Sequence, residues 1–222
     1  MNKVLIVGAS RGIGLEWVRQ CREAGDTVTA TARSDEGLAR IQALGAHALR
    51  VDVADAASAA CLAGLIDGES FDVVVLGAGV YGPRSAGLQP PTPAEFDEVM
   101  HTNVLGVMRV LPQLLDALAP GARLAVLSSR MGSTGLRASS SGWLYRASKA
   151  ALNSVLKDAS LELAGKAICV AFHPGWVRTD MGGAGADIDV ATSVRDMRRT
   201  LAGLQPRDNG AYLNHDGQPL AW

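Results

Sequence analysis

The sequence predicts an α/β fold built on a parallel sheet, and three observations support this prediction. Short apolar runs rich in β-branched residues alternate with longer helical patterns along the 222 residues. The predicted strands are apolar on both faces, which is typical of parallel strands covered by helices on each side. The 48% hydrophobic content is enough to bury one large core, and no repeat or low-complexity tract interrupts it. A single domain of residues 1–222 is therefore expected.

The expected elements follow one another as repeated strand–helix–strand units. Strands are expected at residues 3–7, 27–31, 47–51, 71–76, 122–128 and 167–172. Helices are expected at residues 12–24, 35–44, 57–66, 94–118 and 142–163. Right-handed crossovers would bring the carboxyl ends of the strands to one edge of the sheet, where such folds bind ligands.

Two irregular stretches bear on the domain organisation. The proline-rich residues 89–93 look like a linker, but Thr92 and Glu95 have the spacing of a capping box. Pro93 falls at the first helical position, so a helix start is predicted there and not a domain boundary. The glycine-rich residues 182–186 are compatible with a hinged lid and with a plain loop.

Charge and composition exclude several classes of partner. The formal net charge of -1 gives no general attraction to nucleic acid or to an anionic membrane. No apolar run approaches a membrane span, and residues 4–7 are too short for a signal-peptide core, so a cytoplasmic protein is expected. Cys21, Cys61 and Cys169 are widely spaced and odd in number, which favours buried thiols over a disulfide or a metal site. The histidines likewise show no metal-ligand spacing, and a small-molecule partner is expected.

A glycine-rich turn follows the first strand and opens a helix. It contains Gly8, Ser10, Arg11, Gly12, Ile13 and Gly14. Glycines permit a tight turn and a close backbone approach, while a helix N-terminus offers free N–H groups to a pyrophosphate. The turn therefore predicts a Rossmann-type doubly wound sheet that binds a dinucleotide. The same letters satisfy the G-x-S-x-G nucleophile elbow of α/β hydrolases, but too few residues precede Gly8 to build that fold's oxyanion hole.

The end of the second strand indicates which dinucleotide is preferred. Arg33 stands where an NAD-binding protein carries an acidic residue on the ribose, and arginine suits a 2′-phosphate. Together with Arg11, it predicts NADP(H) in preference to NAD(H). Asp35 argues the other way, although an acidic residue early in a helix also favours the helix N-terminus.

The next two strands end in further candidate cofactor contacts. Asp52 and the backbone amide of Val53 could address an adenine ring, or the aspartate could simply turn the chain. Gly77, Ala78 and Gly79 would present a wall almost free of side chains, against which a cofactor could lie.

Tyr145 and Lys149 are four residues apart in a predicted helix and therefore share one face. A positive charge beside a phenol favours the phenolate and would lower a pKa that is ordinarily about 10. Such a tyrosine could exchange protons with a substrate near neutral pH. On spacing alone, an ordinary surface pair is the commoner explanation, so the remaining motifs decide.

Taken in order, these positions resemble the short-chain dehydrogenase/reductase family over essentially the whole chain. The segments 128–133 and 145–149 and the short tail are most similar to sniffer-type carbonyl reductases and C-factor-like proteins. The resemblance implies that Tyr145 is the general acid or base and that Lys149 lowers its pKa and holds the nicotinamide ribose. It further implies that Ser129 binds the substrate oxygen and that Asn103 anchors a proton-relay water. The implied nicotinamide contacts are Pro174, Gly175, Val177 and Thr179.

Some positions fit the family less well. Ser129 lies 16 residues before Tyr145, whereas Ser133 lies 12 before it, so either serine could contact substrate. Ser129 is preferred because a strand end is better fixed than a loop. Val7 replaces the usual threonine before the first glycine. Leu76-Gly77 replaces the usual paired asparagines, which would remove polar contacts that brace the sheet and cofactor.

Further side chains have an open role. Tyr81, Trp143 and Trp176 could line an apolar substrate pocket or serve only as core or rim aromatics. Three arginines at residues 195, 198 and 199 are interpreted as a solvated helix face, with a patch for an anionic substrate or a partner as the alternative.

The leading hypothesis is an NADPH-dependent reductase of small or medium aldehydes and ketones, reversible toward alcohol oxidation. A dinucleotide-binding signalling or regulatory protein with a vestigial redox site is the alternative from another class. An epimerase or dehydratase of the same fold is a weaker one. The long helices that begin near Ala94 and Gly142 would support a homodimer or homotetramer.

Overall fold

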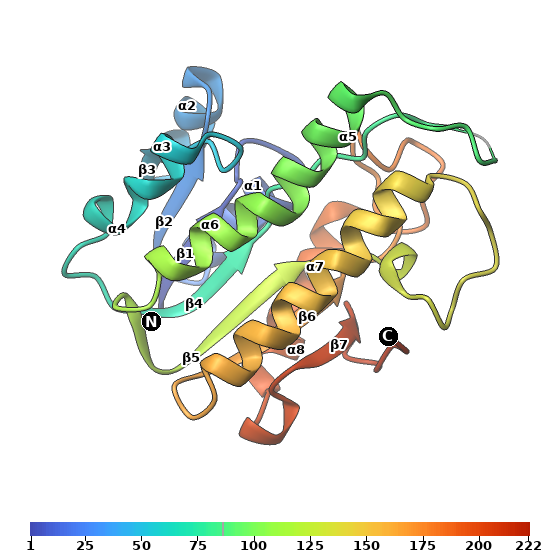
Figure 1. The fold of residues 1–222 in the computed structure, drawn as a ribbon. Helices are drawn as coiled ribbons and strands as arrows, with labels where there is room; N and C mark the ends of the chain where they lie inside the picture. The colour runs from blue at the N-terminus through green and yellow to red at the C-terminus, as the bar shows by residue number, and fades with distance from the viewer. Residues whose placement is uncertain (86) are drawn as a thin grey trace.

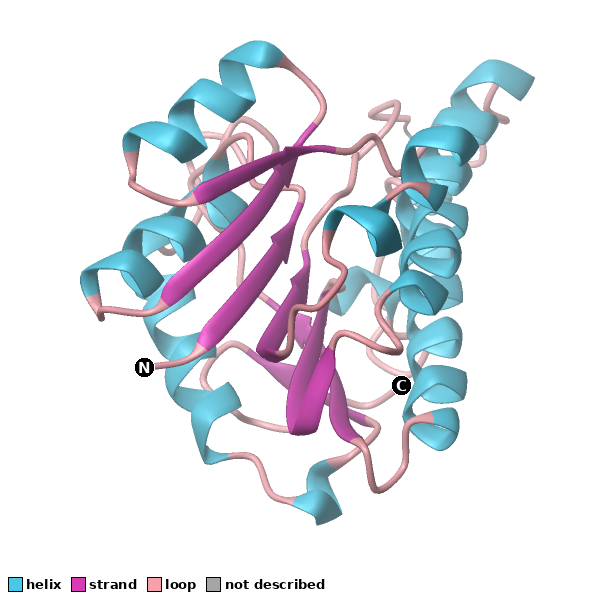
Figure 2. Cartoon of the chain, turned by 90° about the vertical axis from the view of Figure 1, so that its left-hand side faces the viewer, coloured by secondary structure: helices cyan, strands magenta, loops and turns pink. Residues whose placement is uncertain are grey.

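A parallel sheet of seven strands organises the protein. The computed structural model describes residues 1–85 and 87–222. The strand order is β3-β2-β1-β4-β5-β6-β7, and every neighbouring pair is parallel. The strands are β1 (Lys3–Val7), β2 (Thr27–Ala32), β3 (His47–Arg50), β4 (Phe71–Leu76), β5 (Leu118–Leu127), β6 (Ala167–His173) and β7 (Ala211–Asn214). Helices cover both faces of this sheet, so the predicted doubly wound α/β fold is confirmed (Figures 1 and 2).

The two-sided burial follows from the side-chain alternation within each strand. Leu5 and Val7 of β1 belong to one core with residues of α6 (Gly106–Gln113) and α7 (Trp143–Glu162). Val4 and Ile6 point the other way, into a core with α1 (Gly12–Glu23), α2 (Asp35–Ala43) and α8 (Val190–Gly203). Because both faces are buried, the strands read as continuous apolar runs.

Some element boundaries differ from the prediction. The expected helix 94–118 is divided into α5 (Pro93–Met100), a π-helical turn η1 (His101–Leu105) and α6, after which β5 already begins at Leu118. The expected helix 57–66 is divided into α3 (Ala56–Ala60) and α4 (Leu62–Leu65). Strand β7 was not predicted, because four residues give too short an alternation to recognise.

The start of α5 is as predicted. Thr92 caps the helix in a reciprocal capping box with Glu95, and Pro93 occupies the first turn. The proline-rich stretch is thus a helix start. The short 3-10 helices η2 (Arg130–Gly132) and η3 (Pro206–Asp208) complete the assignment. No helix within residues 1–85 and 87–222 is long and apolar enough to cross a membrane.

The topology fixes where a ligand can approach. The chain runs outward from β1 to β2 and β3, and then returns to place β4 on the other side of β1. A reversal of strand order of this kind leaves a crevice at the carboxyl ends of β1 and β4. The glycine turn follows β1 and Gly77 follows β4, so both lie at this crevice.

Candidate functional site

The glycine turn at the crevice is closely packed and cannot accept side chains. Gly8 and Gly12 have positive φ angles of 87° and 54°. A Cβ on Gly14 would lie 2.3 Å from the carbonyl oxygen of Gly8, and one on Gly8 would lie 2.6 Å from the backbone nitrogen of Ala78. Helix α1 begins at Gly12 with no side-chain cap, so its first N–H groups are available to a ligand. This arrangement fits a diphosphate bound against backbone.

Basic side chains surround the outer end of this turn. Arg11 pairs with Asp180 at 2.9 Å, and both side chains are exposed. Arg33 is also exposed at the end of β2. Arg40, which the sequence analysis did not single out, donates from Nη1 to the carbonyl oxygen of Ser10 at 3.2 Å. Its position five residues after Asp35, on the first helix after β2, is the signal that could have identified it.

Asp35 is not a free acidic group beside these basic side chains. Its carboxylate is hydrogen-bonded to Arg50, whose Nη1 also donates to the carbonyl oxygen of Arg33 at 3.0 Å. Asp35 also lies in the first turn of α2, where Ser34 caps the helix. The acidic group is therefore paired with Arg50 of β3 and lies in the first turn of α2, where a negative charge favours the helix N-terminus.

Asp52 turns the chain after β3. One of its carboxylate oxygens accepts a hydrogen bond from the backbone N–H of Ala54 at 3.0 Å. Val53 is buried, and a Cβ on Gly106 would lie 2.9 Å from its side chain. The structure thus accounts for both residues locally, and their contact with an adenine ring stays a prediction.

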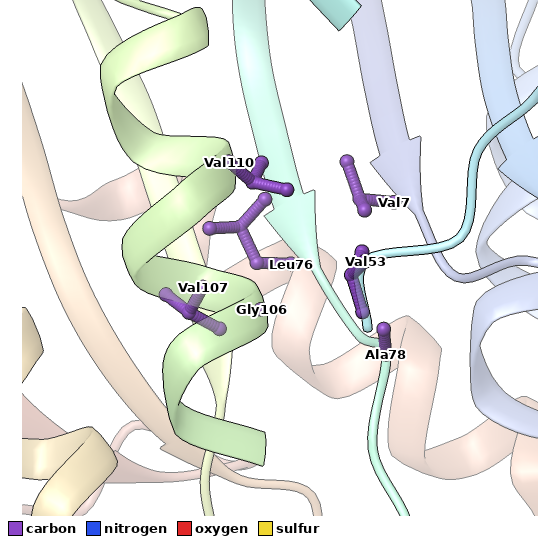
Figure 3. Close-up of a pocket in the computed structure, with 7 residues that line it drawn as sticks. All are labelled: Val7, Val53, Leu76, Ala78, Gly106, Val107 and Val110. Carbon is purple, nitrogen blue, oxygen red and sulfur yellow. The ribbon is translucent and has the colours of Figure 1, made fainter. Parts of the chain in front are cut away.

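The two departures from the family pattern are neighbours in space. Val7 pairs with Leu76 in the register of β1 and β4, and Gly77 N–H donates to the carbonyl oxygen of Val7 at 2.8 Å. Both side chains line a small apolar cavity of about 10 Å³ together with Val53 and Ala78 (Figure 3). Two apolar side chains therefore stand where polar contacts between the strands were expected. At this point β1 and β4 are joined by backbone hydrogen bonds.

Tyr145 and Lys149 lie one turn apart on α7 and are both buried, with 8% and 4% of their surface exposed. Lys149 Nζ donates to the carbonyl oxygen of Leu127 at 2.8 Å and lies 5.7 Å from the centre of the Tyr145 ring. Burial raises the pKa of Tyr145 and lowers the pKa of Lys149 to about 8. The predicted lowering of the tyrosine pKa by Lys149 is therefore wrong for the protein alone, because desolvation dominates and the ammonium is directed at a carbonyl.

The structure separates the two candidate serines. The hydroxyl of Ser129, just past the end of β5, lies close enough to the Tyr145 phenol to lower its pKa, against the larger effect of burial, which raises it. Ser129 Oγ also accepts from Met131 N–H at 3.2 Å. Ser133 is fully buried. Its hydroxyl donates to the carbonyl oxygen of Trp222 and accepts from the backbone N–H of Leu136. The phenol therefore lies beside Ser129, whereas the Ser133 hydroxyl is bonded to backbone groups, and the choice of Ser129 as the substrate-binding serine stays a prediction.

Asn103 lies in the π-helical turn and braces the loop after β4. Its Nδ2 donates to the carbonyl oxygen of Val80 at 2.8 Å and to Ser148 Oγ at 2.9 Å. Its Oδ1 accepts from Val80 N–H at 2.8 Å. A π-helical turn often marks a functional position. Its role as an anchor for a relay water stays a prediction.

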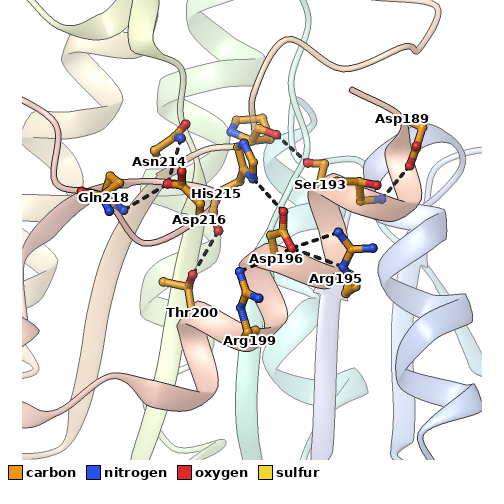
Figure 4. A network of polar contacts seen from close by, with 12 residues as sticks. Asp189, Ser193, Arg195, Asp196, Arg199, Thr200, Asn214, His215, Asp216 and Gln218 are labelled. Carbon is orange, nitrogen blue, oxygen red and sulfur yellow. Dashed lines mark hydrogen bonds and ion pairs between the residues drawn. The ribbon is translucent and has the colours of Figure 1, made fainter. Parts of the chain in front are cut away.

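The segment after β6 is held by α8. Ser193 Oγ donates to the carbonyl oxygen of Pro174 at 2.6 Å (Figure 4). Val177 forms an isolated parallel bridge with Ile188, and Thr179 lies beside Gly12, where an added Cβ would be 3.6 Å from its methyl group. Pro174 and Val177 are thus held by their contacts with Ser193 and Ile188, and Thr179 lies beside the glycine turn.

Figure 4 also shows what two arginines of α8, Arg195 and Arg199, contact. Arg195 and Arg199 are exposed and approach the largely buried Asp196 at 3.2 and 3.6 Å, as does His215 at 3.3 Å. Arg198 is less exposed and lies 3.6 Å from Asp26. The interpretation as a solvated helix face thus holds for Arg195 and Arg199, while Arg198 packs toward the loop before β2.

Of the three candidate pocket aromatics, Tyr81 contacts the phenol. Its ring stacks on Tyr145 with centroids 4.6 Å apart and planes at 23°. Trp143 donates from Nε1 to the carbonyl oxygen of Gln89, and the exposed Trp176 donates to that of Gly182. The guanidinium of Arg84 lies 5.0 Å above the Tyr81 ring. Tyr81 therefore covers the face of Tyr145.

Comparisons with known proteins identify the family of the chain. A family model described as short chain dehydrogenase matches residues 2–187. The chain is 38% identical over 154 residues to C-signal of Myxococcus xanthus, covering 68% of this chain and 92% of that protein. The structure of the carbonyl reductase Sniffer of D. melanogaster superposes with a TM-score of 0.91 at 30% identity over the whole of both chains. The structure of an NADPH-bound carbonyl reductase from chicken fatty liver superposes with a TM-score of 0.88 at 29% identity, covering 100% of this chain and 99% of that one. The chain belongs to the short-chain dehydrogenase/reductase family and is an NAD(P)-dependent oxidoreductase.

Proposed function

We propose that the protein is an NADPH-dependent carbonyl reductase that converts small or medium aldehydes and ketones to alcohols, reversibly. The observation that carries this proposal is the buried phenol of Tyr145, which contacts Ser129 on one side and Tyr81 on another at the crevice edge of the sheet. A nicotinamide supplies the hydride when it is bound. The protein's own groups must then place the carbonyl and provide the proton.

Each side chain has a distinct part in that chemistry. Because its pKa is raised, Tyr145 carries its proton at neutral pH and is suited to donate it to the developing alkoxide. Ser129 would hydrogen-bond the same substrate oxygen, and Lys149 would stabilise negative charge from below the ring. Asn103 holds the loop after β4 and the start of α7 in register through Val80 and Ser148. In the direction of oxidation, Tyr145 would act as the base, a role that its raised pKa confines to alkaline pH.

The residues present fit a phosphorylated dinucleotide. A glycine-rich turn lies at an uncapped helix start, and an added Cβ on Gly79 would lie 3.2 Å from Asn103 Oδ1 and 3.5 Å from Lys149 Nζ. Arg11, Arg33 and Arg40 would recognise a 2′-phosphate. Several similar structures are described as bound to NADP or NADPH, which supports the preference.

Replacing Tyr145 by Phe tests the proposed proton transfer. NADPH oxidation with a panel of aldehydes and ketones should fall by about 10²- to 10⁴-fold. NADPH affinity, followed by fluorescence titration, should stay close to that of the unmodified protein because the hydroxyl is not needed to cradle the diphosphate. Turnover that persists in the variant would refute the assigned role.

A second candidate is a dinucleotide-binding signalling protein, which the name of the relative C-signal brings into consideration. Such a protein would bind NADPH normally and turn over no carbonyl compound. The pairing of a buried phenol with a serine hydroxyl favours the reductase, because binding alone requires neither group. A broad substrate screen of the unmodified protein distinguishes the two functions.

We also propose that residues 1–222 form one domain that carries both the cofactor-binding and the catalytic residues. This domain would assemble in the cytoplasm as a homodimer or homotetramer. Phe96, Met108 and Leu161 are exposed apolar side chains on α5, α6 and α7, the helices expected at a subunit interface. Light scattering during gel filtration measures the oligomeric state, and replacing Met108 by Glu should weaken an interface that includes it.

A further inference from the structure

A pocket of about 370 Å³ opens beside the start of α7, apart from the residues assigned above. Its lining includes Leu88 and Trp143, two arginines at residues 137 and 146, and the serines 139 and 140. Trp143 and Arg146 are three residues apart and so share one face of α7. The pocket therefore combines an apolar wall, hydroxyl groups and two guanidinium groups.

The charge in this pocket is not compensated within the described part of the chain. Only 9% of Arg146 is exposed, and its guanidinium makes one hydrogen bond there, from Nε to the carbonyl oxygen of Ser141 at 2.8 Å. Neither Arg137 nor Arg146 forms an ion pair with any carboxylate of residues 1–85 and 87–222. A buried arginine without a carboxylate is costly unless an anion is supplied. The fork of donors on a guanidinium suits a carboxylate or phosphate in particular.

The pocket is adjacent to the proposed reaction site. Gly142 lies directly before Trp143, and a Cβ on it would be 2.5 Å from the hydroxyl of Tyr81. The ring of Tyr81 in turn stacks on Tyr145. The ring of Tyr81 therefore contacts both the phenol ring and Gly142, the residue directly before the pocket-lining Trp143.

We propose that this pocket is an anion subsite that binds the carboxylate of an apolar carbonyl substrate, and this inference rests on the proposed reductase function. Arg146 and Arg137 would hold the anionic group, while Trp143 and Leu88 would pack against the hydrocarbon body of the substrate. The preferred substrates are then aldehydes or ketones that carry a negatively charged group, not neutral carbonyl compounds.

Two matched substrates test the proposal. With NADPH, kcat/KM for 4-carboxybenzaldehyde should exceed that for its neutral methyl ester, methyl 4-formylbenzoate, by at least tenfold. Arg146→Gln should abolish this preference by raising KM for the acid about tenfold, with kcat and the values for the ester unchanged. Arg146→Lys should restore part of the preference. Arg207→Gln is the control, because that side chain is 84% exposed on η3 and lies outside the pocket lining.

Each result of these measurements either supports or overturns the anion subsite. Equal kcat/KM values for acid and ester, or an equal effect of Arg146→Gln on both, would overturn the anion subsite while leaving the reductase function intact. If Arg146→Gln fails to fold, as judged by circular dichroism, Arg137→Gln carries the same comparison at an exposed position. If neither compound is reduced, the broad screen of aldehydes and ketones decides the proposed function. Calorimetric titration of the NADPH-loaded protein with benzoate then tests the anion site separately. Benzoate binding that is lost in Arg146→Gln or Arg137→Gln supports the site. Absence of benzoate binding to the unmodified protein overturns it.

Discussion

Replacing Lys149 by Met should change how stability depends on pH, because this ammonium is buried. Burial lowers the pKa of Lys149 from an ordinary 10.5 to about 8 in the folded protein. Between these values the unfolded chain binds more protons than the folded one, so the free energy of unfolding rises with pH. Below pH 8 both states are protonated and the folded state bears the full penalty. At about 1.4 kcal/mol per pH unit, the penalty is about 3 kcal/mol.

Urea unfolding of the cofactor-free protein between pH 7 and pH 10 measures this effect. The free energy of unfolding of the unmodified protein, taken relative to Lys149→Met, should rise by about 2 to 3 kcal/mol across that range. Tyr145 affects both proteins alike, because its raised pKa keeps it protonated when folded. Lys157→Met, on the exposed side of the same helix, is the control and should parallel the unmodified protein. Parallel curves for Lys149→Met would show that the ammonium is not desolvated as the structure places it.

Further predictions concern the glycine turn, the cofactor and the serine. Gly14→Ala should abolish NADPH binding or destabilise the fold, because its Cβ would meet Gly8 O at 2.3 Å, whereas Gly64→Ala, with open space around it, should be tolerated in thermal unfolding. Arg33→Ala should raise Kd for NADPH at least tenfold and leave Kd for NADH unchanged in fluorescence titrations, and an equal change in both would contradict the 2′-phosphate contact. Tyr212 donates from its hydroxyl to the carbonyl oxygen of Ser129 at 2.5 Å, so Tyr212→Phe should lower kcat several-fold with NADPH affinity retained. An unchanged kcat would show that this bond does not position Ser129.

Local patterns in the sequence determined the architecture. Apolar runs buried on both faces required a parallel sheet between two helical layers, and the glycine turn after β1 located the ligand crevice. The capping box at Thr92 could be read from four adjacent residues because capping is a local interaction. The spacing of Tyr145 and Lys149 likewise fixed their shared helix face.

Tertiary structure decided the electrostatics of the site. The sequence places the ammonium of Lys149 near Tyr145. In the folded protein both side chains are buried and the ammonium donates to the carbonyl oxygen of Leu127, so burial is the main cause of both pKa shifts. The surroundings of the two candidate serines also depend on distant residues, since Ser133 donates to the carbonyl oxygen of Trp222. Sequence spacing describes neighbours along one element, whereas desolvation and hydrogen-bond partners depend on chain segments that only folding brings together.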